Sequence, residues 1–238
     1  MRTLALGVAA AAAMTAACGE ARSENGPRTQ RSFAVGAFDQ IEVAGPYDVD
    51  VRTGPAPSVS ADGSERDVER MVVKVEGRTL KIYPRKNKGL SFGWSNRGPV
   101  RVAVTVPGLA KAGIAGSGSI KVDKVGGDRF EGEVAGSGDL RLAAVAVNQL
   151  KVGIAGSGEF AAAGRAAEAD YDIAGSGDIN AGKLVAERAR VSIAGSGNVA
   201  AHATATAAVD IAGSGNVRMT GGAKCTVSKA GSGNVDCS

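Results

Sequence analysis

Residues 154–160 read Ile-Ala-Gly-Ser-Gly-Glu-Phe, and the tetrapeptide Ala-Gly-Ser-Gly within them occurs seven times in the chain. Each copy begins 18 to 20 residues after the previous one, and the first residues of the copies are Ala115, Ala135, Ala155, Ala174, Ala194, Ala212 and Ala230. A motif that returns so often at nearly constant spacing indicates a repeat architecture, in which each unit buries its apolar face against its neighbours.

Apolar and polar residues alternate on both sides of the motif. In all seven copies the first residue after the motif is polar and the second is apolar, as in Glu159-Phe160. The residue before the motif is Ile or Val in six copies, and Lys229 replaces it in the last. A period of two with many β-branched residues is typical of strands. It argues against a helical solenoid, which needs a period of about 3.6.

Stacking these strand-turn-strand units in register pairs each strand with its equivalent in the next coil and gathers the apolar residues in one interior. Aromatic residues make up only 4% of the chain, so Ala, Val, Ile and Leu must fill that interior. The glycines suit a corner that needs positive φ. The sequence therefore predicts an all-β fold, a right-handed single-stranded parallel β-helix with regular coils of 18 to 20 residues over residues 112–238.

The N-terminus has the layout of an export signal. A basic start, Met1-Arg2-Thr3, is followed by an apolar run from Leu4 to Ala17 with small residues at its end. The run is shorter than the ~20 apolar residues that span a membrane comfortably. We therefore expect residues 1–17 to be a signal peptide that is removed on export.

The end of this signal allows two kinds of cleavage. Thr15-Ala16-Ala17-Cys18 resembles a bacterial lipobox, apart from Thr15 in place of the usual Leu. In that case Cys18 is acylated and the polar residues 18–32 form a flexible tether to the membrane. Ordinary signal-peptidase cleavage nearby is the alternative. Both place the protein in the bacterial cell envelope, as an outer-membrane lipoprotein or a periplasmic protein.

The other two cysteines, Cys225 and Cys237, lie near the C-terminus, and an exported protein favours their pairing in a disulfide. In the repeat alignment Cys237 takes the place of Met219, and strand alternation directs both thiols inward. Cys18 is then the unpaired cysteine, which an acyl anchor explains.

Residues 33–111 contain further alternating segments separated by longer loops; these segments are Phe38–Val43, Tyr47–Val51, Leu80–Tyr83 and Val102–Pro107. Together with the Gly-Ser-Gly-Asp and Gly-Ser-Gly-Asn turns they resemble the bacterial auto-transporter adhesin head GIN domain family. The resemblance covers residues 33–238 and implies a β-helix in the cell envelope, with no catalytic residues to carry over. We expect residues 33–111 to be irregular first coils that cover one end of the stack, because an open end presents unpaired strand edges.

A basic segment from Arg78 to Arg101 has seven cations, no acidic residue and the only tryptophan, Trp94. Cations beside aromatic side chains suit anionic glycans or phosphorylated headgroups of an envelope surface. The residues expected to contact such a ligand are Arg85, Lys86, Lys88 and Trp94. The alternative is a solvated loop whose aromatic residues cover the end of the stack. Export argues against nucleic acid as the partner.

Three acids, Asp139, Glu159 and Asp178, follow the motif in consecutive coils. Stacked carboxylates could bind Ca²⁺ or perform acid-base chemistry on a glycan. Asn takes the same position from Asn198 onward, which favours the simpler role of hydrogen bonding along the ladder. The calcium-binding nonapeptide repeat is absent, and His202 is the only histidine, so no zinc site or serine hydrolase is predicted.

These observations predict a non-catalytic envelope protein without a cofactor, adhesin-like, that binds a glycan or a protein surface and reaches the membrane through an N-terminal lipid anchor. Two alternatives stay open. One is a carbohydrate-active β-helix enzyme that uses the stacked carboxylates, and the other is a purely structural envelope component.

Overall fold

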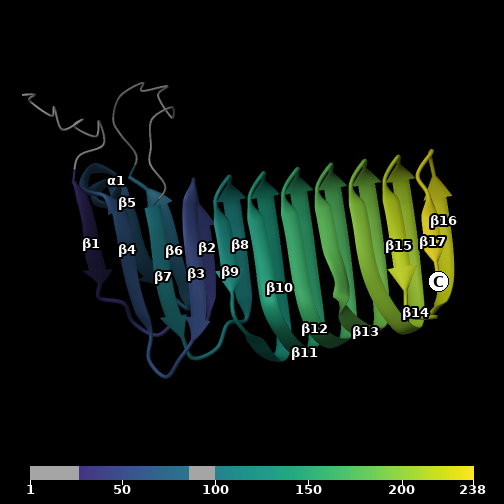
Figure 1. Ribbon diagram of the computed structural model, residues 1–238, viewed down its shortest axis with the longest axis horizontal. Helices are drawn as coiled ribbons and strands as arrows, with labels where there is room; N and C mark the ends of the chain where they lie inside the picture. Colours follow the sequence, from purple (N-terminus) through teal and green to yellow (C-terminus); the bar gives the residue numbers. More distant parts are fainter. Residues whose placement is uncertain (1–26, 86–99) are drawn as a thin grey trace, which may run out of the picture.

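The computed structural model describes residues 27–85 and 100–238, and these residues form a parallel β-helix (Figure 1). All strands belong to one sheet that winds around a single apolar interior. The predicted fold class is confirmed. The coils follow one another along the rod, with β1 at one end and β17 at the other (Figure 1).

The regular coils begin at β8, and each strand pairs in parallel with its equivalent in the next coil. The strands are β8 (Lys111–Gly116), β9 (Ser119–Val122), β10 (Val125–Gly136), β11 (Asp139–Gly156), β12 (Glu159–Gly175), β13 (Asp178–Gly195), β14 (Asn198–Gly213), β15 (Asn216–Thr220), β16 (Lys224–Ala230) and β17 (Val235–Cys237). The motif residues stay in register, since Ala135 pairs with Ala155 and Ala155 with Ala174.

The motif forms a corner at which neighbouring coils approach closely. Gly136 has a φ of 114°, and a Cβ placed on it would lie 2.6 Å from the carbonyl oxygen of Gly116 in the preceding coil. A Cβ on Gly138 would lie 2.6 Å from the carbonyl oxygen of Gly118. The backbone N–H of Ser137 donates to the Gly116 oxygen at 2.9 Å. Both glycines are therefore required by sterics, the first also by its backbone conformation.

The other turns of the coil absorb the differences in repeat length. The register of β11 against β12 shifts between Leu142 and Val145, and that of β13 against β14 shifts between Ala181 and Val185. No shift occurs at the motif corner of these pairs. A coil can therefore have 18, 19 or 20 residues without disturbing the alignment of its motif.

The interior consists of stacked side chains from equivalent positions. Ile154, Ile173 and Ile193 pair in successive coils, and none is more than 3% exposed. The larger Phe160 and Tyr171 are also buried. Burial of such apolar area is the main stabilising contribution in a repeat protein, and it comes from neighbouring coils.

The first coils are less regular than the later ones. Their elements are β1 (Arg28–Phe33), β2 (Gln40–Ala44), β3 (Tyr47–Thr53), β4 (Ser58–Ser64), α1 (Glu65–Arg70), β5 (Met71–Glu76), β6 (Thr79–Pro84) and β7 (Val100–Val106). β2 and β3 continue the parallel stack through β8 and β9. β1 pairs antiparallel with β4, β4 antiparallel with β7, and β5 antiparallel with β6.

This antiparallel end and α1 were not predicted from the sequence. Residues 28–32 belong to β1, although the sequence predicts that the tether extends through residue 32. The polar segment shows no alternation, and its strand conformation comes from pairing with β4. Helix α1 begins at a cap where the Ser64 hydroxyl accepts from the N–H of Asp67 at 3.2 Å.

Among the described residues, the coil of β16 and β17 is the last one at the C-terminal end of the stack. Cys225 pairs in register with Ala207 and Cys237 with Met219, which are both buried positions. The two cysteines form a disulfide with a Cα–Cα distance of 6.7 Å, and this confirms the predicted pairing and inward register. Lys229, which replaces the inward Ile, donates to the Gly233 carbonyl oxygen at 2.7 Å.

Candidate functional site

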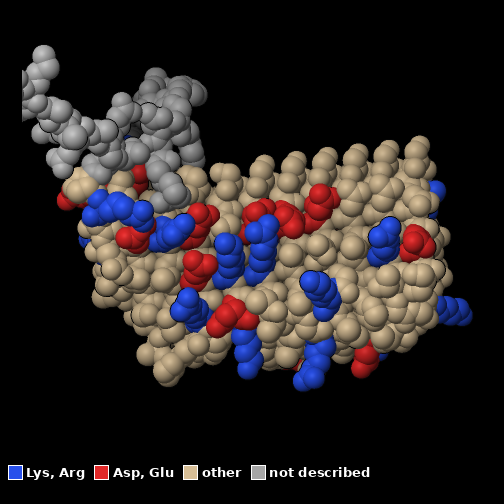
Figure 2. Space-filling model, viewed as in Figure 1, with Lys and Arg blue, Asp and Glu red and all other residues tan. Residues whose placement is uncertain are grey.

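The side chains that follow the motif form a ladder along one face of the rod. Ser119, Asp139 and Glu159 pair in successive coils, and the ladder continues through Asp178 and Asn198. Each side chain lies where its strand leaves the corner, so alternation directs it outward. Figure 2 shows red acidic side chains in a row near the upper edge of this face.

The acids of the ladder are each engaged with a neighbouring polar group. Arg141 lies one strand alternation beyond Asp139, and its Nη2 is 3.4 Å from the Asp139 carboxylate and 3.1 Å from that of Glu159. Asp178 accepts from the side-chain amide of Asn198 at 2.8 Å and from its backbone N–H at 3.2 Å. The carboxylates of the three acids therefore accept hydrogen bonds from the Arg141 guanidinium and from Asn198.

The amide part of the ladder is hydrogen-bonded from coil to coil. Asn216 donates from its side chain to the Asn198 side-chain oxygen at 3.0 Å, and the Asn216 side-chain oxygen accepts from the backbone N–H of Asn234 at 3.1 Å. This is the stacking role predicted for the ladder. Because each side chain uses only part of its donor and acceptor capacity in this way, the outer edges of the amides remain open to a ligand.

A shallow groove of about 740 Å³ runs over the C-terminal half of this face, from Glu159 to Asp236. The amide ladder forms one side, Asn180 and Ala200 form the floor, and Arg218 lies toward the C-terminal end. Small side chains on β13 and β14 make the floor low. The groove crosses β12, β13, β14, β15 and β17 and is open along its length, which suits an extended chain better than a small compact molecule.

The stacked acids form a single row on one face of the rod. Within residues 27–85 and 100–238 no group of three or more His, Cys, Asp and Glu side chains is placed to hold a metal ion. Glycosidases place two carboxylates on opposite sides of the scissile bond, whereas Asp139, Glu159 and Asp178 lie in one row on one face.

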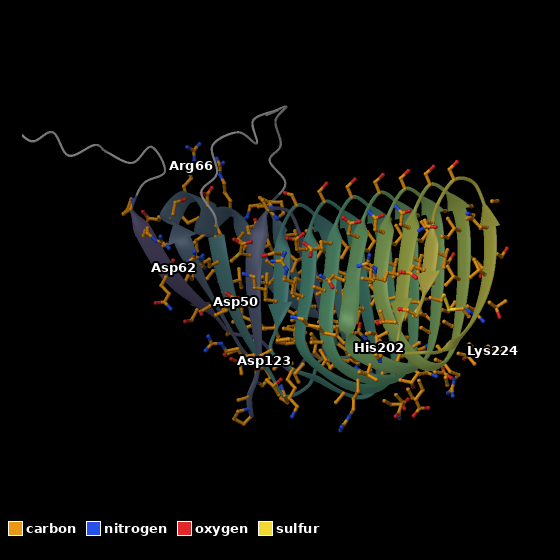
Figure 3. The ribbon with its side chains drawn as sticks, turned by 45° about the vertical axis from the view of Figure 1, so that its right-hand side comes forward. Asp50, Asp62, Arg66, Asp123, His202 and Lys224 are labelled. Carbon is orange, nitrogen blue, oxygen red and sulfur yellow. A yellow bond between two sulfur atoms is a disulfide. The ribbon has the colours of Figure 1, made fainter. Side chains whose placement is uncertain are left out.

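His202 lies away from the acidic row. Its Nδ1 is 3.1 Å from the hydroxyl of Thr220, which itself donates to the Ala201 carbonyl at 3.3 Å. Figure 3 shows His202 near the lower edge of the rod, remote from Asp50 and Asp62. The hydrogen-bond partner of this imidazole in the described chain is therefore a hydroxyl and not the carboxylate that a catalytic base requires.

Several predicted site residues fall outside the described part of the chain. These are Cys18, Lys86, Lys88 and Trp94. Arg85 is described and exposed, and its backbone N–H donates to the Arg70 carbonyl at 2.7 Å. The structure therefore places the start of the basic segment at the antiparallel end of the rod. Among the described residues, no helix has the length and apolar character to cross a membrane.

Sequence reasoning found the ladder but missed the groove. The polar residue after each motif predicts the ladder directly. The groove instead depends on the size of the next outward side chain, two residues after each ladder residue. Ala161, Asn180 and Ala200 stand there between the long Arg141 and Arg218 side chains. Aligning this second outward position could have revealed the low floor.

A family model matches residues 37–223 and is described as "Putative auto-transporter adhesin, head GIN domain". No curated protein sequence matches the chain. The matched segment contains the first coils and most of the regular ones, so the resemblance noted in the sequence extends over most of the chain.

Several solved structures have a similar fold. A structure described as a putative adhesin from Bacteroides fragilis superposes with a TM-score of 0.81 at 21% identity, covering 91% of this chain and 99% of that one. One described as a putative lipid binding protein from Parabacteroides distasonis has a TM-score of 0.71 at 27% identity, covering 90% and 98%. A second structure from that species, described as a putative adhesin, has a TM-score of 0.68 at 22% identity, covering 90% and 98%.

Proposed function

The chain belongs to the family of auto-transporter adhesin head GIN domains, and from that premise we propose that it is a non-catalytic binding rod of the bacterial cell envelope. Membership of an adhesin family indicates an extracellular or cell-surface protein. Its task is to hold a glycan or a protein surface against the cell, in an adhesin-like manner.

The groove beside the amide ladder is the observation that carries this proposal. It crosses several coils, is open at the surface, and presents amide and carboxylate side chains at the strand spacing of ~4.8 Å. Side-chain amides both donate and accept, so they match the hydroxyl groups of a sugar chain or the backbone of an extended peptide. A continuous row of such groups binds a polymer through many weak contacts rather than through one deep pocket.

The arrangement of the acids supports binding without catalysis. Asp139 and Glu159 share the Arg141 guanidinium, and Asp178 accepts from two donors of Asn198. A general acid in a glycosidase must instead hold a proton beside the leaving oxygen. The enzyme alternative would need these contacts to be broken.

Attachment to the membrane is proposed through an acyl chain on Cys18. The lipobox-like Thr15-Ala16-Ala17-Cys18 and the disulfide between the other two cysteines support it, because Cys18 is then the single thiol left over. Replacement of Cys18 by Ser should release the protein from the membrane fraction. Retention of the variant in that fraction would contradict the lipid anchor.

The basic segment provides a second proposed contact. Seven cations between Arg78 and Arg101 favour an anionic polymer or headgroup, and Arg85 is exposed at the beginning of the stretch. Changing Arg85, Lys86, Lys88 and Trp94 to Ala should weaken salt-sensitive binding to anionic envelope polymers. Unchanged binding would restrict ligand contact to the faces of the coils.

The groove can be tested with a matched pair of substitutions on β14. Ala200 lies in the groove floor and Ala208 on another face, and both side chains are half-buried and point outward. Ala200→Arg should fill the groove and reduce retention of the exported protein on an array of envelope polysaccharides and extracellular proteins by at least about tenfold. Ala208→Arg should bind as the unmodified protein does. Equal binding by both variants would exclude the groove as the contact surface.

A further inference from the structure

A second depression lies on the other side of the motif corner, over the first coils. It has a volume of about 330 Å³ and crosses four neighbouring parallel strands in the order β6, β2, β8 and β10. Its position differs from that of the ladder groove, because its lining residues precede the corner in each coil, whereas those of the groove follow it. We call it the trough, and its lining includes Glu42, Ala44, Lys81, Tyr83, Gly113, Ala115, Glu133 and Ala135.

The floor of the trough is low because its outward positions are small. Ala44 and Ala115 pair with each other across β2 and β8, and Gly113 lies one alternation before Ala115. An ideal Cβ on Gly113 would lie 3.7 Å from the Glu42 Cγ and 3.9 Å from the Ile41 carbonyl oxygen, which are ordinary contacts. The position therefore accepts a side chain without a backbone clash, so backbone sterics do not require a glycine there.

One wall of the trough carries the Tyr83 ring. Lys74 on the adjacent strand β5 places its Nζ 5.3 Å from the centre of the ring, in a cation–π contact that fixes its orientation. Hydrogen bonds with Glu76 and with Tyr83 raise the pKa of Lys74, so it remains charged beside the ring. The ring is thus held in place at the edge of an open apolar floor.

Charged groups stand at the rim, and each is already balanced. Lys81 Nζ is 2.9 Å from Glu76 and 3.8 Å from Glu42. On the opposite rim, the Lys111 Nζ is 3.0 Å from the Glu133 carboxylate. Burial lowers the pKa of Lys111, but the hydrogen bond with Glu133 and the negative charges of Glu133, Glu131 and Glu42 together outweigh this effect, so the net shift is upward. Of the two described rim lysines, Lys81 and Lys111, neither is an unbalanced cation for an anionic ligand.

We propose that the trough binds a neutral sugar ring of a surface glycan. A pyranose has an apolar C–H face, which would lie on Ala44 and Ala115 beside the buried Gly113, and hydroxyl groups around its edge. Those hydroxyls can donate to the carboxylates of Glu42 and Glu133, which have lone pairs left after pairing with lysine. An apolar surface with a few converging polar groups is the usual composition of a site for a small ligand.

The charges decide between this ligand and the other candidates. An anionic sugar would approach Glu42 and Glu133 with no free cation among the described lining residues to compensate. A peptide strand added by backbone pairing would need an unpaired edge, but β6, β2, β8 and β10 are all paired on the sheet at this point. A neutral polyhydroxyl ligand meets neither obstacle.

The trough proposal rests on the proposed binding function and adds to it a ligand class and a position. It is tested by filling the trough through Gly113→Leu in the full-length exported protein. Gly153 is the matched control. Gly113, Glu133 and Gly153 occupy equivalent positions in three successive coils, and nothing lies within 4 Å of an ideal Cβ on Gly153. Tyr83→Leu serves as a second trough variant that adds no bulk.

The ligands are four neutral hexasaccharides, namely cellohexaose, maltohexaose, laminarihexaose and mannohexaose, with hexagalacturonate as the anionic comparison, and binding is measured by titration calorimetry at low and high salt. We expect at least one neutral probe to bind with little salt dependence. Gly113→Leu and Tyr83→Leu should weaken it by about tenfold or more, and Gly153→Leu should bind like the unmodified protein. Far-UV circular dichroism checks that each variant is folded.

The following results would contradict the binding of a neutral sugar in the trough. Binding of a neutral probe that neither trough variant weakens, but that Ala200→Arg abolishes, would move recognition to the ladder groove and leave the proposed function intact. Salt-sensitive binding of hexagalacturonate alone would show that the ligand is anionic. A protein that binds none of the five probes while still retaining a polymer on the array would reject neutral sugar recognition, and one that retains nothing would reject the proposed function as well.

Discussion

The interior coils and the last coil have the same pattern of residues but very different burial. On one inward ladder, Tyr171, Val191 and Val209 are at most 1% exposed, whereas Val227 at the next step is 46% exposed. The alternation of a coil therefore decides which way a side chain points, and the next coil decides whether it is buried. Val227 is exposed because no described coil lies beyond it, although it stays in register with Val209.

The last coil replaces the missing neighbour with local restraints. The Cys225–Cys237 disulfide joins its two strands, and Lys229 binds the Gly233 carbonyl where earlier coils bury Ile. The charge of Lys229, at the end of the row of inward Ile residues, also makes this end of the rod a poor surface for stacking a second rod. The comparison predicts that equivalent substitutions have large effects in the interior and small or local effects in the last coil.

The largest effect is expected at the motif corner of an interior coil. Gly156 has a φ of 130°, and a Cβ on it would collide with the Gly136 carbonyl of the preceding coil. Strain and overlap together should make Gly156→Ala cost about 3 kcal/mol or more of unfolding free energy. Gly231→Ala meets the same kind of collision with Gly213, but the last coil can detach alone.

Urea unfolding followed by far-UV circular dichroism separates these two variants. Gly156→Ala should lower the midpoint of the main transition, and Gly231→Ala should leave it almost unchanged while the final coil loses hydrogen-exchange protection. Gly182→Ala is the control, because nothing lies within 4 Å of its ideal Cβ. Equal destabilisation by all three substitutions would show that close approach at the corner is not what requires glycine.

The second effect concerns the disulfide. Closing a loop of 12 residues stabilises a folded unit by up to ~3 kcal/mol in the chain-entropy model. Replacing both cysteines by Ser should therefore fray residues 224–237 at a temperature below the main transition, since repeat stability is mostly between neighbours. Hydrogen exchange read by mass spectrometry locates the loss. A lowered main transition with uniform exchange would mean that the rod unfolds as one unit.

A smaller effect is expected from truncating one ladder at two steps. Val209→Ala leaves a cavity between two covered coils and should cost about 2 kcal/mol. Val227→Ala removes a methyl pair that is already half in solvent and should cost less than about 0.5 kcal/mol. Denaturant midpoints at constant m-value measure both. Similar costs would contradict the view that the last coil lacks a covering neighbour.

The smallest effect is a dependence on alkaline pH that comes from one interior side chain. Burial raises the pKa of Tyr171, so the folded state keeps the phenol neutral. Below the unfolded pKa of ~10 both states are protonated and no difference arises. Above it the unfolded chain ionises first, and stability falls by up to about 1.4 kcal/mol per pH unit until the folded pKa is reached.

Tyr171→Phe should remove this part of the alkaline loss. The measurement is the unfolding free energy of both proteins at pH 8 and at two points above pH 10. Identical pH profiles for the unmodified protein and Tyr171→Phe would show that water reaches the interior of the rod at Tyr171.

The regular coils could be predicted from the sequence because direction and register are both written in the repeat. Alternation around each motif assigned Ile154 and Phe160 inward, and the motif spacing aligned one coil with the next. The antiparallel strands β1, β4 and β5 could not be predicted in the same way. Their partners are set by long-range pairing, and β1 has no apolar alternation of its own.

The candidate sites divide along the same line. The ladder and the disulfide depend on positions relative to the motif, and the sequence was sufficient for them. The ladder groove and the trough depend on gaps between outward side chains of different coils, such as Gly113 beside Glu42 and Glu133. Such gaps become visible only after the first, irregular coils are placed in register with the regular ones.

Following binding and turnover in one sample shows most directly whether the rod binds its ligand without cleaving it. The exported protein is incubated with the polysaccharide that it retains best, and the bound amount and the chain-length distribution of the polysaccharide are measured over time. We predict saturable binding that Ala200→Arg or Gly113→Leu weakens, with a chain length that does not change. Progressive shortening of the polysaccharide, abolished by Asp139→Asn, Glu159→Gln or Asp178→Asn, would contradict a non-catalytic rod and establish the stacked acids as an active site.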